Sequence, residues 1–311
     1  MSAVVTFYQF APLPEPEAVR ASLYKAAEQE GIKGTILLAE EGINGTLTGP
    51  RAALDRFAEV LRAVPGFAAM PFKFSTADAG NPVFYRLKVK VKAEIVALGK
   101  PEVKPAERTG THVDAAAWNA LLDDPEVIVI DTRNDYEIGI GTFPGALDPH
   151  TRSFKQFPDY VAGLDPDRHK KVAMFCTGGI RCEKASAYML DQGFEAVYQL
   201  DGGILNYLET VPDADNRWEG ECFVFDQRVS VDSGLSEGTY VQCFACRRPL
   251  TEGDVASPAY EEGVSCPHCI NEQGEDQRAA FLERQRQVEL SRARGELHVG
   301  QAMPRAVSGT E

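Results

Sequence analysis

The residues best suited to chemistry in this chain are two cysteines and an arginine that follow a short apolar run. The run at 171–175 leads to Cys176, and the segment Thr-Gly-Gly-Ile then leads to Arg181 and Cys182. A helical pattern continues to residue 190, so the sequence predicts a strand, a tight loop and a helix. The amides of such a loop and the helix N-terminus favour negative charge at one point. A cysteine held there has a lowered pKa and is a thiolate nucleophile at neutral pH.

The spacing within this loop narrows the chemistry. Four residues separate Cys176 from Arg181, and two of them are Gly178 and Gly179. The spacing resembles that of the rhodanese active-site loop, whose cysteine carries a persulfide. The cysteine phosphatases have five residues between the same two positions and a wider loop. The resemblance implies a site for a sulfur atom or a small group rather than for phosphate, and the alternative is a buried structural cysteine at a strand end.

Cys182 lies in the first turn of the predicted helix. From there its thiol could resolve an oxidised or persulfidated Cys176 by forming a disulfide. A small apolar residue packed beneath the helix is the other interpretation. The sequence leaves both open.

The surrounding elements predict an α/β domain with a parallel sheet at 112–212. A β-branched run at 127–130 is typical of a buried parallel strand. Asp131 and Arg133 follow at its carboxyl end, where open α/β sheets carry functional groups. The order of these motifs resembles a rhodanese domain, although Thr142-Phe143 stands where many rhodaneses have His-Ile.

Residues 1–98 predict a separate α+β domain. Apolar strands and two helical stripes follow in the order β-α-β-β-α-β, which suggests a ferredoxin-like fold. Residues 99–111 contain two prolines, mixed charges and little apolar content. We therefore expect a linker there.

One strand near the end of this first domain alternates strictly between cationic and apolar residues. Period two places Arg86, Lys88, Lys90 and Lys92 on one face. In a chain with a net charge of −14, such a stripe is suited to contacts with nucleic-acid phosphates. A solvated strand whose lysines block edge-to-edge aggregation explains the same pattern.

The last region, 213–311, is predicted to be a small cysteine-rich module with a helix. Two Cys-x-x-Cys pairs are separated by 19 residues, which is the spacing of a zinc ribbon. The four expected ligands of a structural zinc ion are Cys243, Cys246, Cys266 and Cys269. A dithiol redox role is the competing interpretation. A segment at 275–296 alternates Arg with Glu, which favours a solvated, salt-bridged helix over a nucleic-acid contact.

Length, composition and cysteine count limit the class of protein to which the chain can belong. The chain has 311 residues, 44% hydrophobic and 25% charged, as in ordinary globular proteins. It has no apolar stretch long enough to span a membrane and begins without a signal pattern, so we expect a cytoplasmic protein without membrane contact. Seven cysteines in that compartment favour metal binding or catalysis over disulfides. We find no flavin, haem or iron-binding motif.

Across about 300 residues the chain resembles the rhodanese-type tRNA uridine hydroxylases. The resemblance rests on the string Glu-Gly-Ile-Asn-Gly-Thr from Glu41, the loop from Cys176 with the Glu-Lys-Ala-Ser that follows it, Phe-Val-Phe-Asp from Phe223, and the cysteine pairs. It implies oxygen-dependent hydroxylation of uridine at C5, at wobble position 34 of tRNA, with molecular oxygen as co-substrate.

The resemblance also implies roles for residues near the cysteine. Cys176 either adds to C6 of the base or carries a sulfur–oxygen species, and the sequence does not choose between them. Arg133, Tyr136 and Glu137 are expected nearby, Tyr136 to stack on the base and Glu137 to move a proton. Two other functions stay open, a persulfide sulfurtransferase that needs no tRNA and a tRNA- or protein-binding module with an inactive rhodanese domain.

Overall fold

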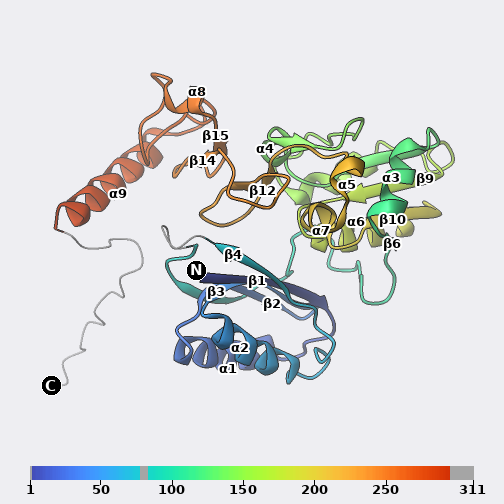
Figure 1. Cartoon of the computed structure of the whole chain (residues 1–311), viewed down its shortest axis with the longest axis horizontal. Helices are drawn as coiled ribbons and strands as arrows, with labels where there is room; N and C mark the ends of the chain where they lie inside the picture. The colour runs from blue at the N-terminus through green and yellow to red at the C-terminus, as the bar shows by residue number, and fades with distance from the viewer. Residues whose placement is uncertain (1, 78–82, 295–311) are drawn as a thin grey trace. The chain divides into compact units, whose positions relative to one another are not determined.

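The computed structural model describes residues 2–77 and 83–294. The chain divides into two compact units, Met1–Tyr240 and Val241–Glu311. The first unit contains the ferredoxin-like and rhodanese-like folds (Figure 1), and the second contains the paired cysteines.

A mainly antiparallel sheet with two helices forms the first fold, as predicted from the sequence. Its elements are β1 (Ser2–Phe10), α1 (Pro16–Gln29), β2 (Lys33–Ala39), β3 (Gly42–Gly49), α2 (Arg51–Arg62), β4 (Lys73–Ala77) and β5 (Leu87–Val91). In the described part of the chain the strand order is β4-β1-β3-β2-β5, in which β4-β1-β3-β2 is the ferredoxin-like order and β5 adds an edge parallel to β2.

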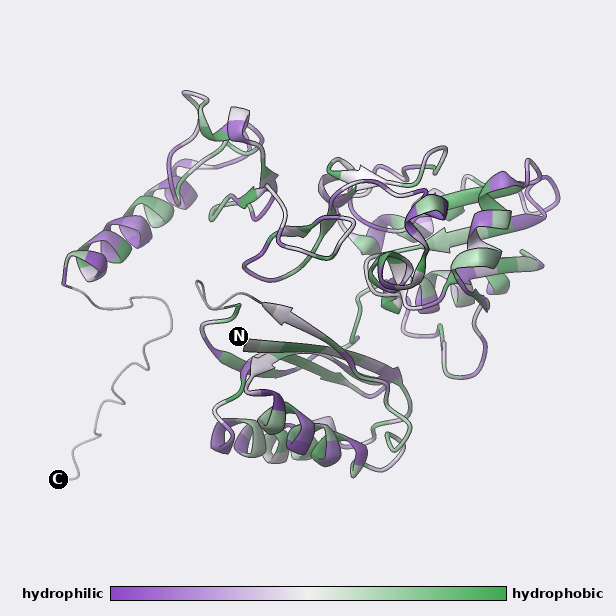
Figure 2. Ribbon diagram, viewed as in Figure 1, coloured by the Kyte–Doolittle hydropathy of each residue, from purple (hydrophilic) through white to green (hydrophobic). Residues whose placement is uncertain are grey.

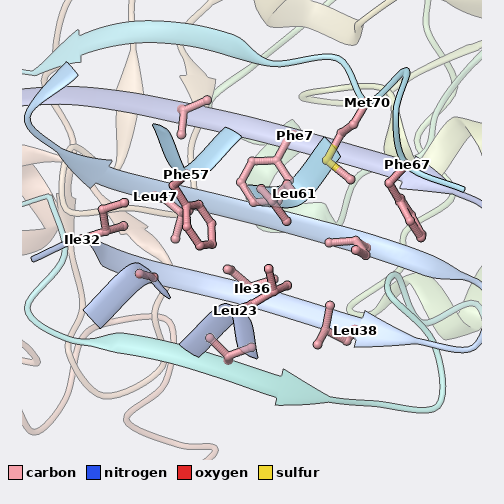
Figure 3. Close-up of a cluster of buried hydrophobic side chains, with 14 of the residues drawn as sticks. Phe7, Leu23, Ile32, Ile36, Leu38, Leu47, Phe57, Leu61, Phe67 and Met70 are labelled. Atoms are coloured by element: carbon pink, nitrogen blue, oxygen red, sulfur yellow. The ribbon is translucent and has the colours of Figure 1, made fainter. Parts of the chain in front are cut away.

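One face of this sheet forms a core with the two helices. Apolar residues at helical spacing on α2, including Leu54, Phe57 and Leu61, pack against alternate residues of the strands, such as Phe7 and Leu47 (Figure 3). The residues between them on the strands, such as Tyr8, therefore point to the other face of the sheet.

The cationic stripe has the predicted alternation. On β5 Val89 is buried against the core, whereas Lys88 and Lys90 are exposed, and Arg86 and Lys92 are exposed at its two ends. The strand is at the edge of the sheet, so both interpretations of the stripe remain consistent with the fold.

The second fold is the predicted α/β domain with a parallel sheet. Its elements are β6 (Thr111–Val113), α3 (Ala115–Asp123), β7 (Val127–Asp131), α4 (Asp135–Ile138), β8 (Gly141–Thr142), a 3-10 turn (Phe154–Gln156), α5 (Phe157–Val161), β9 (Lys171–Phe175), α6 (Ile180–Asp191), β10 (Ala196–Leu200) and α7 (Gly203–Thr210). The parallel sheet has the order β6-β10-β9-β7. Residues of α5 and α6 pack on one face of it and residues of α3 and α7 on the other, and its apolar strands stand out in Figure 2.

Two segments outside the predicted folds pack against the rhodanese-like core. The expected linker at 99–111 is not a free spacer, because Val103 is buried in the rhodanese-like core and Gly110 donates to Ser186 Oγ. The segment 213–240 belongs to the first unit rather than to the cysteine-rich module, because Trp218 is buried among the aromatic residues of the rhodanese-like core. This segment contains a second 3-10 turn (Asp213–Asp215), β11 (Glu219–Gly220), β12 (Cys222–Phe223) and β13 (Ser230–Val231).

The second unit is small and built around the cysteines. It consists of the hairpin β14 (Val241–Gln242) and β15 (Pro249–Leu250), the short helix α8 (Glu252–Val255) and the long helix α9 (Glu275–Ala293). Ion pairs such as Arg278–Glu261 at 2.7 Å hold α9 to the module, as expected for a salt-bridged helix. Within the described residues no helix is long and apolar enough to cross a membrane.

Candidate active site

The predicted strand, loop and helix surround Cys176. Strand β9 ends at Phe175, Cys176 is buried, and α6 begins at Ile180 with Gly179 as its N-cap. The Gly179 N–H donates to Cys176 Sγ at 3.1 Å. Gly179 has a φ of 93°, and a Cβ there would lie 2.8 Å from the Tyr8 hydroxyl oxygen. Glycine is therefore required both by the loop conformation and by the close approach of Tyr8.

The loop makes Cys176 a thiolate at neutral pH. Burial alone would raise the pKa of its thiol, but a hydrogen bond from the Cys182 thiol, the charge of Arg181 and the amides of these two residues outweigh it. Together they lower the pKa of Cys176 to about 6. Burial and the neighbouring Cys176 raise the pKa of Cys182, so Cys182 stays protonated and donates. Cys182 Sγ also lies 3.6 Å from Thr132 Oγ1.

Arg181 is held rigidly by Glu137. Its two terminal nitrogens each donate to a carboxylate oxygen of Glu137 at 2.7 Å, and both side chains are buried. Such a bidentate pair fixes the guanidinium in one orientation. The fixed charge of Arg181 therefore acts on Cys176 without the flexibility of a surface arginine.

Arg133 is inside the protein rather than beside the loop opening. It donates to Asp131 at 2.9 and 2.6 Å and to the carbonyls of Glu137 and Gly141. The two carbonyl contacts tie the end of β7 to the segment 137–141, which carries Glu137. Arg133 was expected next to a substrate, and its burial does not agree with that position. A buried charge needs internal partners, and the guanidinium of Arg133 finds them in Asp131 and the two carbonyls.

Tyr136 and Gly178 lie closer to the surface than Arg133. Tyr136 is half-buried, its ring packs edge-on against Phe223 at 5.3 Å, and its hydroxyl accepts from Asn134. Gly178 is half-buried, and a Cβ there would meet open space. The structure thus gathers Cys176, Cys182 and the two loop glycines with Arg181, Glu137 and Tyr136. Among the described residues, no contact links the cationic stripe of β5 to this group.

The segment after the rhodanese-like domain reaches the cysteine loop. Thr177 Oγ1 donates to the Phe223 carbonyl at 3.4 Å. Two residues later, the Phe225 ring lies with its centroid 5.8 Å from the guanidinium carbon of Arg181. In the sequence this segment was recognised only as one of the motifs that carry the family resemblance, and no role was predicted for either phenylalanine.

The four cysteines of the second unit form one cluster. The sulfur atoms of Cys243, Cys246, Cys266 and Cys269 all lie within 4.8 Å of one another, with 3.8 Å between Cys246 and Cys266. A tetrahedral zinc ion with Zn–S bonds of about 2.3 Å requires S–S edges of about 3.8 Å. The side-chain amide of Gln273 donates to Cys269 Sγ at 3.1 Å, which suits a ligand that carries negative charge. This donor set could hold a metal ion.

Comparisons with known proteins agree with this architecture. Residues 2–95 match the family model described as UPF0176 acylphosphatase like domain, and residues 114–210 match the rhodanese-like domain model. The chain is 54% identical over 299 residues to a protein of Agrobacterium fabrum named tRNA uridine(34) hydroxylase, covering 96% of this chain and 94% of the relative. The chain belongs to the tRNA uridine(34) hydroxylase family. A relative of the same name from Teredinibacter turnerae is 54% identical over 308 residues, covering 99% of this chain and 95% of that protein.

The similarity to these relatives includes the N-terminal fold. This fold places residues near the cysteine loop that were not predicted from the sequence. The Tyr8 hydroxyl of β1 donates to Glu183 Oε1 at 3.3 Å. Burial, with the charges of Glu183 and Cys176, raises the pKa of Tyr8, so its hydroxyl stays protonated. His112, Thr109 and Gln199 also contact the Glu183 carboxylate. No local pattern signals this pairing, because Tyr8 and Glu183 are 175 positions apart.

The next residue of α6 makes a second link to the N-terminal fold of this hydroxylase-family chain. Lys184 is fully buried, and its Nζ lies 2.7 Å from Glu41 Oε2 and 2.5 Å from Glu94 Oε2. Glu41 is the first residue of the string that carried the family resemblance. The structure shows that the string pairs with α6, the helix that follows the cysteine loop.

Proposed function

We propose that this chain hydroxylates uridine at C5, at wobble position 34 of tRNA, with molecular oxygen as co-substrate. The single observation that carries the proposal is the buried Cys176, with a pKa of about 6, in a chain 54% identical over nearly its whole length to proteins named for that activity. The comparisons favour this function over sulfur transfer, because the similarity covers both flanking regions and not the rhodanese-like domain alone.

Cys176 is the proposed nucleophile toward the base. Addition of the thiolate to C6 of uracil forms a C–S bond and moves an electron pair toward C5, which becomes the carbon that accepts oxygen. Arg181 and the loop amides, including that of Gly179, stabilise the negative charge that develops. Loss of the C5 proton and expulsion of the thiolate then restore the aromatic base. An anticodon base can be extruded from its loop, so no helix has to be opened.

The overall reaction also requires two electrons. One atom of oxygen enters C5 and the other leaves as water, which takes two electrons and two protons. Once the thiolate has left C6, oxidation of the Cys176–Cys182 dithiol to a disulfide supplies both and breaks the remaining O–O bond, and an external thiol then restores the dithiol. We therefore assign Cys182 as the resolving thiol, which agrees with its contact to Cys176.

The remaining predicted residues have supporting roles in this proposal. Glu137 orients Arg181 and Arg133 braces the segment that carries Glu137, whereas Tyr136 and Gly178 border the approach to the cysteine. Arg86, Lys88, Lys90 and Lys92 are proposed to contact tRNA phosphates. A structural zinc ion held by the four clustered cysteines is proposed to fold the second unit.

Mass spectrometry of tRNA nucleosides tests the function directly. In cells that lack the protein, restoring the wild-type chain should produce a uridine species about 16 mass units heavier, for one added oxygen, and the Cys176→Ser variant should not. Unchanged nucleosides would contradict the proposed function and would direct attention to thiosulfate turnover. A folded Cys176→Ser variant with full activity would rule out the thiolate.

An exchange experiment separates the two roles considered for Cys176. Without oxygen, a C6 adduct can only take a proton at C5 and revert, so a deuterium label at C5 of uridine 34 should be lost to solvent. The loss should require Cys176. Retention of the label by wild-type protein that is active in air would exclude addition to C6 and leave delivery of oxygen from a sulfur–oxygen species.

A further inference from the structure

We infer that Phe225 is the surface on which the target uracil stacks when it enters the site, an inference that rests on the proposed function. The segment 222–229 would then be part of the substrate site, although it lies outside the rhodanese-like domain. The ligand class is a single unstacked pyrimidine base.

The first support is the exposure of the ring. Phe225 is 61% exposed, more than any other large apolar side chain that the structure describes as exposed. One exposed apolar residue alone says little. The position of Phe225 is informative, because its ring centroid lies 5.8 Å from the guanidinium carbon of Arg181, and Arg181 lowers the pKa of Cys176. An aromatic ring left open beside a reactive cysteine is suited to a planar, uncharged partner.

The second support is that the ring is held in place without a ligand. Phe223 packs edge-on against Phe225 at 5.1 Å, and the Phe223 carbonyl accepts from Thr177 of the cysteine loop. After Phe225 the chain turns back through Asp226, which is buried and pairs with Arg228 at 2.6 Å. Val224 N–H donates to the Val229 carbonyl across this turn at 2.9 Å. A ring fixed in this way loses little conformational freedom when a base binds.

The third support is the engagement of the neighbouring aromatic residues. Tyr136 was expected from the sequence to stack on the base, but its ring packs edge-on against Phe223 and its hydroxyl bonds to Asn134. Phe223 is itself buried between Tyr136 and Phe225. Phe225 is therefore the member of this aromatic group with an open face, and stacking of single bases on such rings is a general mode of RNA recognition.

The test measures coupling between Phe225 and base 34. Two anticodon stem-loop RNAs are compared, one with uridine at position 34 and one abasic there. Phe225→Ala should weaken binding of the uridine RNA by roughly 10- to 100-fold, the usual effect of losing one stacked base. Binding of the abasic RNA should change by no more than about twofold, since independent changes add. Equal losses on both RNAs, or no loss on either, would overturn the inference.

Three further variants make the test specific. Phe225→Trp should bind close to wild type, whereas Phe225→Leu should lose most of the effect, because leucine is apolar but has no aromatic face. Wild-type binding by the leucine variant would overturn stacking. Tyr24→Ala, which removes a partly exposed ring on α1 without touching the site, should leave binding unchanged. The alkylation rate of Cys176 should be the same in all variants, which shows that the loop is intact.

The outcome can be separated from that of the proposed function. If wild-type protein forms 5-hydroxyuridine and Phe225→Ala forms it with an unchanged kcat/KM, the function stands and the stacking role fails. If wild-type protein forms no product, the proposed function fails. The comparison of uridine and abasic RNAs then still decides whether Phe225 contacts the base.

Discussion

Replacing Lys184 by methionine should destabilise the protein far more than removal of a surface ion pair. Lys184 is fully buried, whereas Glu41 and Glu94 are 18% and 8% exposed. At 2.7 Å and an effective dielectric constant of about 20, each pair has about 6 kcal/mol of gross attraction. Desolvation offsets much of that gain, but removing one partner of a buried pair typically costs about 3–5 kcal/mol. Since water reaches Glu41, we expect a loss of about 3 kcal/mol.

Urea unfolding followed by tryptophan fluorescence is a suitable assay. Both tryptophans of the chain, Trp118 and Trp218, lie in the rhodanese-like core. For an m-value of about 3 kcal/mol per M, the midpoint should fall by about 1 M with no change in slope. Arg20→Met is the matched control, because Arg20 and Glu17 also form an ion pair at 2.8 Å but are 45% and 70% exposed. It should cost less than about 1 kcal/mol.

A triple variant isolates the charge effect. Combining Lys184→Met with Glu41→Gln and Glu94→Gln removes all three charges. It keeps an acceptor for the Ile95 amide, but glutamine has one side-chain oxygen, so residue 94 can accept from only one of the Leu98 and Gly99 amides. It should recover part of the stability, because a neutral cluster leaves no buried charge unpaired. A Lys184→Met variant no less stable than Arg20→Met would refute this reasoning.

The same cluster predicts a pH dependence. Burial would raise the pKa of Glu94, but Lys184 and the amide of Gly99 outweigh it and lower the pKa below the ordinary value of 4.5. The unfolded chain therefore binds a proton first as the pH falls. The contribution of Glu94 to stability is complete above the ordinary value and is lost as the pH drops through the lowered one. The difference between wild type and the triple variant should shrink over that range.

Three other measurements test the site and the metal. The rate of Cys176 alkylation, followed by peptide mass spectrometry, should rise with a midpoint near pH 6, and Cys182→Ala should move the midpoint upward because a hydrogen bond to the thiolate is lost; an unchanged midpoint would contradict that role. Lys88→Glu with Lys90→Glu should weaken tRNA binding. The slope of log K against log salt concentration should become shallower by about 0.7 to 0.9 for each lost phosphate contact, and an unaltered slope would favour a solvated edge strand. Metal analysis of the purified chain should find one zinc ion per chain and none after Cys266→Ser, with tryptophan fluorescence of the first unit unaffected, whereas a metal-free wild-type chain would support a dithiol role instead.

Local patterns in the sequence account for most of the fold. The β-branched run at 127–130 and the apolar run before Cys176 became parallel strands, and Asp114 caps α3 by accepting from the Ala117 amide. These features depend on residues that are close together in the sequence, so periodicity and capping rules can predict them. The alternation on β5 likewise gave the correct faces of that strand.

Features that depend on distant pairing could not be predicted. Alternation shows that Tyr8 and Phe7 point to opposite faces, but it does not say that Glu183 meets Tyr8. Arg133 follows a strand end, as functional residues do, yet Asp131 draws its guanidinium inward. The packing of the segment after residue 212 could not be predicted for a similar reason, because only the tertiary structure shows that Trp218 completes the rhodanese-like core.

The first turn of α6 has a consequence for how this sequence can change. Four consecutive side chains there, residues 181–184, have different partners. Arg181 contacts Glu137, and Cys182 contacts Cys176. Glu183 contacts Tyr8, and Lys184 contacts both Glu41 and Glu94. Each step along a helix rotates the side chain by about 100°. One inserted or deleted residue in this turn would therefore misdirect the following side chains together. The number of residues in this turn is therefore fixed, and insertions and deletions among relatives of this chain should be confined to other segments.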